Sequence, residues 1–373
     1  GQNIVYADIE GNIGWRPAVY IPLRREGFSM LPRPGHDINY DWNGKVPFED
    51  MPFIYNPASG FISTANNRTI GIQFPYYISG LWADASRAKR IEKVLESLPE
   101  GNMVDMKKLQ LDYTSEFGKE ILKFLRFYKI EFENDELKDA VDILLRWDGI
   151  ESKESIGALL FHVYIKNLIE NIYEDEFALL GPEYIKTYMS LKYLKDRKLR
   201  EVLESGKSSW IDDVRTPRRT EKLIDIIESS YYDMFEELIK RYGKNKSNWK
   251  WGDAHTLTHK HTLSKVKILD YLFSLNVGPY RSGGSSWTPN AGGYSLNDPY
   301  KQISGASMRR IVDFSDLNKT QMILPTGQSG LYNSPHYNDQ AELYHSGKYR
   351  TTYFNEDYIR NSNSFKKLII IPE

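Results

Sequence analysis

Two adjacent amides, Asn66 and Asn67, end the half-apolar run "FISTANNRT" at residues 61–69, and Arg68 follows them. Asparagine tolerates a left-handed backbone and closes turns, so the pair can simply terminate a strand. A carboxamide held in a fixed position can also donate its N–H to the oxyanion of an acyl-transfer intermediate. The residue types therefore leave two interpretations open, the common one of a turn and the chemical one of an oxyanion donor.

Three histidines, His255, His259 and His261, form a second group in the segment "HTLTHKH". Their spacings of four and two residues cannot place all three on one face of a single helix or strand, and no nearby acid completes a zinc-type triad. We therefore expect an exposed, Thr-rich strand, and we keep a His-cluster metalloprotein as an alternative from a different class.

The serines and the remaining acids give no catalytic pattern. Ser329 in "GQSGL" has glycines at −2 and +1 rather than −2 and +2, and no strand-to-helix pattern surrounds it, so it does not fit a nucleophile elbow. "RSGGSSW" at 281–287 lacks the lysine of a phosphate-binding loop. Asp313 and Asp316 are most simply strand-end and turn residues. We expect no acylated nucleophile within this chain.

Composition excludes several classes of protein. The 373 residues carry 49 basic and 50 acidic side chains, a net charge of −1, so there is no electrostatic argument for nucleic acid or an anionic membrane as a partner. The absence of cysteine excludes disulfides, Cys-ligated zinc and a thiol nucleophile. No apolar run approaches the roughly 18 residues of a spanning helix. With 40% hydrophobic residues the chain is globular.

The elements that must position these residues follow a β, α, β order, which indicates an α+β fold. We expect a β-rich part at 1–83, a helical block at 84–244 and a second β-rich part at 245–373. The two β-rich parts should complete one sheet system, with the helical block inserted between them. No internal repeat or low-complexity linker interrupts the chain.

Turn residues and hydrophobic periodicity predict several individual elements. A hairpin should form around "IEGN" at 9–12, and a strand should cover "GFISTANN". Helices are predicted at 85–98, at 155–173 as a buried central helix, and from 216 with Thr216 as N-cap and Gly243 as C-cap. Toward the end, we expect the following elements: a strand pair at 307–316 and 320–325, a short capped helix within 334–347 and a closing strand at 366–373.

Several segments, taken in order, resemble the later part of the catalytic β chain in the penicillin acylase (penicillin amidase) family of N-terminal-nucleophile hydrolases. The resemblance covers nearly the whole chain and is weakest at 100–240. The segments that carry it are "NIVYADIEGNIGW", "LPRPG", "YNPASGFISTANN", "RIVDFSD" and "PTGQSGLYNSPHYNDQAELYHSGKYR".

The resemblance implies an αββα sandwich, present here in part, and cleavage of an amide by an N-terminal serine whose α-amine serves as its base. The reference pKa of an α-amine lies near 8, so it can take a hydroxyl proton near neutrality. Carried over residue by residue, it makes Asn66 an oxyanion donor and Asn67 the turn residue. Arg87, at the start of the next helix, is implied to hold that asparagine, although a solvated helix charge is the plain alternative.

Two features depart from the family pattern. The chain begins with Gly1, which has an α-amine and no nucleophile. The segment "QFPYYISG", after the amide pair, has Tyr76 and Tyr77 where the family has a calcium-binding acid. We therefore predict no calcium site or required cofactor in this chain, although structural calcium is possible in the full-length family fold.

Our sequence-based hypothesis is a fragment of an amidohydrolase that is inactive alone. Its partners would be a small acyl-amide substrate and a missing N-terminal part, meaning the α chain and the start of the β chain. The first alternative is an inactive binding or structural module of the same fold. The compartment is not determined, although family members are often periplasmic or secreted.

Overall fold

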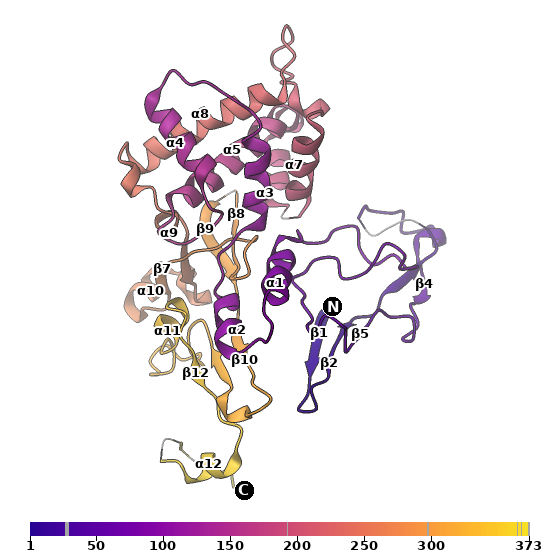
Figure 1. The fold of residues 1–373 in the computed structure, drawn as a ribbon, viewed down its shortest axis with the longest axis vertical. Helices are drawn as coiled ribbons and strands as arrows, with labels where there is room; N and C mark the ends of the chain where they lie inside the picture. Colours follow the sequence, from indigo (N-terminus) through magenta and orange to yellow (C-terminus); the bar gives the residue numbers. More distant parts are fainter. Residues whose placement is uncertain (27–29, 192, 297, 364, 367, 372–373) are drawn as a thin grey trace.

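The computed structural model describes residues 1–26, 30–191, 193–296, 298–363, 365–366 and 368–371. Helices dominate the middle of the chain, and strands lie before and after them (Figure 1). The strands are β1 (Gln2–Ala7), β2 (Ile13–Ala18), β3 (Pro22–Arg24), β4 (Trp42–Lys45), β5 (Ile54–Tyr55), β6 (Thr256–His259), β7 (Val277–Arg281), β8 (Gly292–Ser295), β9 (Asp298–Gly305), β10 (Arg309–Ile311), β11 (Gln321–Ile323) and β12 (Arg350–Thr351). The α-helices are α1 (Ser86–Glu96), α2 (Met103–Gln110), α3 (Glu116–Leu125), α4 (Asp135–Arg146), α5 (Ile156–Leu180), α6 (Pro182–Ser190), α7 (Leu194–Ser205), α8 (Leu223–Tyr242), α9 (Trp251–Ala254), α10 (Lys267–Phe273), α11 (Ala341–His345) and α12 (Glu356–Asn361).

Three regions are visible in space (Figure 1). The helices α3 to α8 gather at one end of the molecule, and the C-terminal strands extend away from them to the other end. The N-terminal strands lie to one side of this axis. Helix α1 stands between the N-terminal strands and the rest of the molecule.

The helical block holds most of the hydrophobic core. Helix α5 has apolar residues on nearly every side and is buried along most of its length, as its sequence predicts. Its first turn is capped by Ser155, whose hydroxyl accepts a hydrogen bond from the Ala158 amide. Helices α4, α6 and α8 pack around it. A rigid, well-packed block of this kind can fix the position of the segments that join it.

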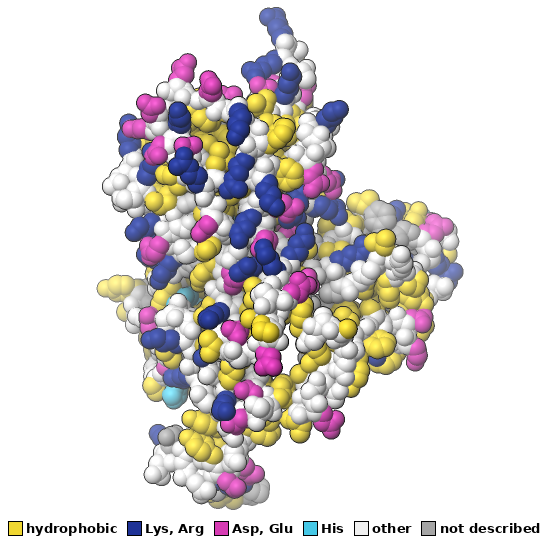
Figure 2. Space-filling view, viewed as in Figure 1, with side chains coloured by type: hydrophobic (Ala, Val, Ile, Leu, Met, Phe, Trp, Pro, Cys, Tyr) yellow, Lys and Arg dark blue, Asp and Glu magenta, His cyan; other side chains and the backbone are white. Residues whose placement is uncertain are grey.

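The N-terminal part has a much smaller core. Residues Ile21, Val46 and Met51 form its own buried cluster. The strand β1 is exposed along its whole length, with about half of the surface of Ile4 and Val5 accessible (51% each). Figure 2 shows hydrophobic side chains gathered over this part, whereas charged side chains are scattered over the helical block.

The predicted hairpin is confirmed. Strands β1 and β2 pair antiparallel from Gln2 opposite Ala18 to Ala7 opposite Ile13, and β5 adds to the other side of β2. The turn is closed by Asp8, whose carboxylate accepts hydrogen bonds from the amides of Glu10 and Asn12. Helix α1 and the strand pair β10–β11 also form where the sequence predicts them.

The prediction of one shared sheet is wrong for this chain by itself. In the part that the structure describes, the strands form four separate sheets, ordered β1-β2-β5, β3-β4, β7-β6-β9-β8 and β10-β11-β12. No N-terminal strand pairs with a C-terminal strand among them. Strand pairing between distant segments depends on long-range geometry, which the local sequence pattern does not specify. The three-part division of the chain stays a prediction.

Four local predictions need correction. Residues 60–67 contain no strand, and helix α8 begins at Leu223 rather than near Thr216, although Gly243 does follow its last residue. The short helix α11 forms, but Gln340 gives it no side-chain cap. Of the predicted closing strand, residues 366 and 368–371 are not in a strand, and the other residues lie outside the described range.

Helix hydropathy gives one further result. Among the described residues, no helix is both long enough and apolar enough to cross a membrane.

Candidate functional site

The loop that ends at the amide pair is shaped by Asn66 itself. Asn66 adopts a left-handed backbone with φ of +64°, which asparagine tolerates better than most residues. The turn residue is therefore Asn66 rather than Asn67, which corrects the assignment that the resemblance implied. The Asn67 side chain instead accepts a hydrogen bond from the Ala65 amide at 3.0 Å and closes the loop from the other side. The left-handed backbone directs the loop around the exposed Asn66 side chain.

Arg87, in the first turn of α1, fixes the carboxamide of Asn66. One guanidinium nitrogen, Nη2, donates to the Ala65 carbonyl and to Asn66 Oδ1, each at 2.8 Å. Because arginine can only donate, the atom it contacts must be the amide oxygen, and the amide nitrogen must lie on the other side. Within the described residues, Asn66 Nδ2 makes no hydrogen bond. The structure thus brings together both residues that the resemblance assigned to catalysis, and it leaves an N–H donor available.

Two further contacts hold the loop against α1. The Ser63 hydroxyl donates to Glu92 Oε1 at 2.9 Å, and the Ala83 amide donates to the Asn66 carbonyl at 3.1 Å. Glu92 lies one and a half turns beyond Arg87 on the same helix, so α1 contacts the loop at two points. The sequence analysis missed Glu92, because a glutamate in a helix with alternating charge gives no distinguishing signal.

The charge of Arg87 is not neutralised by a contacting acid. In the described part of the chain, no carboxylate lies within 4.0 Å of its guanidinium nitrogens. Burial lowers the pKa of Arg87, and the nearby Tyr193 and Asp84 partly offset that shift. Since an arginine side chain stays protonated in proteins, the positively charged guanidinium of Arg87 directly contacts the oxygen of the Asn66 amide. That charge polarises the amide and makes its N–H a stronger donor.

A cavity of about 360 Å³ opens beside this pair. Its wall is formed by the loop, by α1 and by the start of β1, and the residues that line it are Gly1, Gln2, Asn3, Thr64, Ala65, Asn66, Arg87, Ile91 and Pro289. The start of the chain therefore lies next to the available amide. Gly1 has no side-chain hydroxyl or thiol, so it adds no nucleophilic side chain beside the amide N–H donor.

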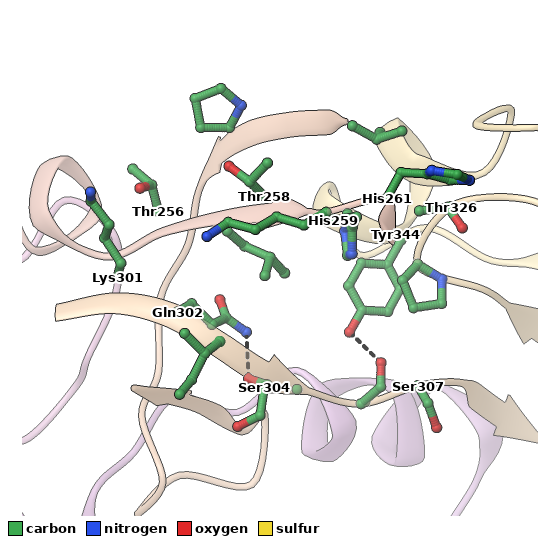
Figure 3. Close-up of a pocket in the computed structure, with 18 of the residues that line it drawn as sticks. Thr256, Thr258, His259, His261, Lys301, Gln302, Ser304, Ser307, Thr326 and Tyr344 are labelled. Carbon is green, nitrogen blue, oxygen red and sulfur yellow. Dashed lines mark hydrogen bonds between the residues drawn. The ribbon is translucent and has the colours of Figure 1, made fainter. Parts of the chain in front are cut away.

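A second cavity, of about 900 Å³, is larger (Figure 3). It is lined by residues of the paired strands β6 and β9 and by the loop that carries Ser329. The Ser329 hydroxyl accepts from the Leu331 amide at 3.1 Å, and no described histidine contacts it. Two hydrogen bonds are drawn in Figure 3: Gln302 Nε2 donates to the Ser304 carbonyl at 3.0 Å, and the Tyr344 hydroxyl donates to the Ala306 carbonyl at 2.7 Å. Among the described residues that line the larger cavity, no serine hydroxyl is hydrogen-bonded to a histidine side chain.

The three histidines do not converge. His255 is fully buried, and its Nδ1 lies 2.6 Å from the Tyr300 carbonyl. His259 Nε2 lies 3.1 Å from Nε2 of His345, while His261 Nδ1 accepts from a backbone amide two residues on. The strand prediction holds for Thr256–His259, but the expected exposure is wrong, because His255 is buried and no residue of this strand is exposed. Among the described residues, no three His, Cys, Asp or Glu side chains form a group that could hold a metal ion.

The segment after the amide pair has no acidic residue at 73–80, and the Tyr76 hydroxyl donates to Asp50 Oδ2 at 2.5 Å. Calcium requires six to eight oxygen ligands, usually with carboxylates among them. The absence of a calcium site in this chain stays a prediction.

Comparisons with known proteins find acylases among the relatives of this chain. The chain is 28% identical to the acyl-homoserine lactone acylase QuiP of Pseudomonas aeruginosa over 99% of its own length and 46% of the relative's. It is also 28% identical to penicillin G acylase of Escherichia coli, over 66% of this chain and 32% of that protein. The chain thus spans less than half the length of these relatives.

The fold resembles that of a solved acylase. The thermostable penicillin G acylase of Alcaligenes faecalis superposes with a TM-score of 0.64 and 19% identity, covering 100% of this chain and 68% of the acylase chain. The expected α+β fold of the N-terminal-nucleophile type is confirmed by this likeness. The family model for penicillin amidase matches residues 1–361. The chain therefore belongs to the penicillin amidase family.

Proposed function

We propose that this chain supplies the side-chain half of the oxyanion site of an acyl-amide hydrolase. The observation that carries the proposal is the contact between Arg87 Nη2 and Asn66 Oδ1 beside a cavity that Asn66 lines. Among the described residues, Asn66 Nδ2 is left without a hydrogen-bond partner. A fixed N–H of this kind is worth most where negative charge develops, because it needs no reorganisation during the reaction.

The reaction would require a nucleophile from another part of the full-length protein. A serine hydroxyl at a chain start would attack the amide carbonyl while its own α-amine takes the hydroxyl proton. The carbonyl oxygen would gain a negative charge and accept the N–H of Asn66. Collapse of this intermediate would break the C–N bond, and the departing amine would take the proton. Water would then hydrolyse the acyl ester and regenerate the serine.

The substrate class follows from the relatives' names, which point to N-acyl compounds such as acyl-homoserine lactones and penicillin G. We propose an amide that joins an apolar acyl group to a small amine. The residues near Asn66 in this chain require no cofactor for that chemistry.

The test is hydrolysis of a fatty-acyl amide and of a phenylacetyl amide by two proteins. One is the 373-residue chain, and the other is the same chain joined to the preceding part of its gene product. We expect turnover from the joined protein and none from the chain alone.

Two results would contradict the proposal. Turnover by the chain alone, lost on replacing Ser329, would show that the nucleophile is internal. A joined protein that carries a chain-start serine but hydrolyses neither amide would favour a binding module of the same fold.

A further inference from the structure

An ion pair joins the helical block to the start of α1. Asp84, two residues before α1, contacts Arg200 of α7, and the two residues are 116 positions apart in the sequence. Both side chains are largely buried, at 9% and 18% exposure. Burial alone would raise the pKa of Asp84, but the hydrogen bond and charge of Arg200 lower it overall, so the carboxylate stays ionised.

Asp84 uses its two oxygens for different purposes. Oδ2 contacts Arg200, while Oδ1 accepts the amide of Ser86 at 2.9 Å, the first residue of α1. A carboxylate here satisfies a free amide at the helix start and interacts favourably with the helix dipole. Asp84 is therefore held at one end by the helical block and itself holds the first turn of α1 at the other.

Arg200 is in turn fixed by α3. Its guanidinium donates from Nε to Glu120 at 3.0 Å and lies 4.8 Å from the centroid of the Phe117 ring. Phe117 is fully buried and stacks on Trp287 with a centroid separation of 4.3 Å. A planar guanidinium with contacts on its edge and on its face has little freedom to move.

The contact of Asp84 with Ser86 affects the amide site, because Arg87 is the next residue in the chain. Arg87 follows Ser86 directly, so the position of the first turn of α1 sets where its guanidinium meets Asn66. We propose that Arg200 is a positioning residue: through Asp84, it holds the first turn of α1 so that Arg87 can orient the Asn66 carboxamide. This inference rests on the proposed function, and it assigns the helical block a role at the site.

Arg200 does not act on the cavity beside Asn66 by placing its own charge there. Arg200 does not touch the cavity that Asn66 faces, and its partners are the carboxylates of Asp84 and Glu120. Its effect on catalysis therefore passes through Asp84, which holds the start of α1 and whose charge also acts on Arg87. This distinction can be tested, because an effect that passes through Asn66 disappears when Asn66 no longer has a carboxamide.

The experiment uses the joined, full-length protein and a neutral pair, Arg200→Gln with Asp84→Asn. Replacing both partners avoids leaving Asp84, the more buried of the two carboxylates, as an unpaired charge, while Glu120, which also loses Arg200, is one-third exposed (33%). The matched control is Lys198→Gln, an exposed cation on the same helix that pairs with Glu201. Each change is made in the wild-type and in the Asn66→Ala background, and kcat and KM are measured for a fatty-acyl amide.

We expect the neutral pair to lower kcat by about tenfold and to leave KM within about twofold, because small misplacements of a catalytic group mainly affect the chemical step. In the Asn66→Ala background the same pair should change kcat by less than about twofold. A crystal structure of the neutral-pair chain should show the Arg87–Asn66 contact lengthened or lost. Lys198→Gln should have no effect.

The outcomes that overturn the inference differ from those that overturn the proposed function. If the neutral pair leaves kcat and the Arg87–Asn66 contact unchanged, the positioning role is overturned. The proposed function still holds in that case if Asn66→Ala alone lowers kcat by a large factor. A kcat loss of the same size in both backgrounds also overturns the positioning role, because the effect then bypasses Asn66. If the wild-type joined protein hydrolyses no amide, the proposed function fails. The crystal structure of the neutral-pair chain then tests by itself whether Arg200 and Asp84 position Arg87.

Discussion

The loop at Asn66 and the histidine segment at 255–261 both place polar groups beside a cavity, but they differ in which atoms they leave free. At the loop, Arg87 occupies the amide oxygen of Asn66 and leaves Nδ2 facing open space. In the histidine segment, His259 is hydrogen-bonded to His345, and the one unpartnered nitrogen of His255 is fully buried.

This difference shows that the size of a cavity does not identify a reactive site. The larger cavity, about 900 Å³, has no serine hydroxyl hydrogen-bonded to a histidine among its described lining residues, while the smaller one, about 360 Å³, is lined by Asn66, whose Nδ2 has no hydrogen-bond partner within the described part of the chain. We therefore expect substitutions at Asn66 and Arg87 to change catalysis more than stability. Substitution of the buried His255 should do the reverse.

The largest expected effect is on catalysis at the loop. In the full-length protein, Asn66→Ala should lower kcat by about 10²–10³-fold, the usual loss for one oxyanion donor. Asn66→Asp should be at least as harmful, since a carboxylate has no N–H and places a negative charge beside the oxyanion. The matched control is Asn66→Gly, which suits the φ of +64° and should lose the same activity while being about 1 kcal/mol more stable than the alanine variant. Steady-state kinetics and urea unfolding of the three variants test this, and near-wild-type kcat in either small variant would remove Asn66 from the mechanism.

The next effect is on stability at His255. Burial lowers the pKa of His255 to about 3, from an ordinary value of 6.5. Between these values the unfolded chain binds a proton that the folded chain does not, so stability falls as the pH is lowered through this window and is independent of this group above it. The loss should be on the order of 3 kcal/mol between pH 6.5 and pH 4.

The check is urea unfolding from pH 8 to pH 4 for the wild-type chain and for His255→Asn, whose amide can still donate to the Tyr300 carbonyl. The variant should show a pH slope that is shallower by up to about 1.4 kcal/mol per unit. Parallel curves would mean that His255 is not the neutral, buried group described here. The joined variant should keep wild-type kcat at pH 8.

A smaller catalytic effect is expected at Arg87. Arg87→Lys keeps a positive charge but shortens the side chain and loses the planar fork, so the two contacts from Nη2 cannot both persist. We expect kcat to fall by about tenfold with little change in KM. Lys89→Gln, an exposed change on the same helix, serves as control and should be silent. An equal loss in both variants would mean that the general charge of α1 matters rather than the contact with Asn66.

The smallest effect separates the two amides. Asn67→Ala removes the acceptor of the Ala65 amide and should cost about 1 kcal/mol of unfolding free energy, with kcat within about threefold of wild type. Chemical unfolding and kinetics on the same preparation measure both quantities. If Asn67→Ala abolished activity while Asn66→Ala did not, the two amides would have exchanged roles.

Local patterns predicted the elements that are held by local forces. The helix at Ile156–Leu180 follows from its apolar run and its Ser155 cap, and the hairpin at Gln2–Ala18 follows from its turn. The start of α8 was misplaced because the Thr216 hydroxyl donates to Glu221 in a loop instead of capping a helix. A threonine can either cap a helix or hydrogen-bond within a loop, and the local sequence does not distinguish these two roles.

The candidate site was predictable only through resemblance. Residue type and spacing left Asn66 as a turn or a donor, and resemblance paired it with Arg87. A left-handed turn at the amide pair was foreseen from the residue type, but at Asn67 rather than at Asn66. The ion pair of Asp84 with Arg200 was beyond sequence reasoning, because a contact between segments far apart in the chain leaves no periodic signal.

The measurement that tests the central claim most directly is a crystal structure of the full-length protein inhibited by an alkyl fluorophosphonate. The serine oxygen would bond to phosphorus with loss of fluoride, which leaves a tetrahedral group that mimics the intermediate. The account predicts a phosphoryl oxygen 2.7–3.1 Å from Asn66 Nδ2, with Arg87 still bonded to Oδ1. A phosphoryl oxygen more than about 4 Å from Nδ2, and bound only by other donors, would contradict it.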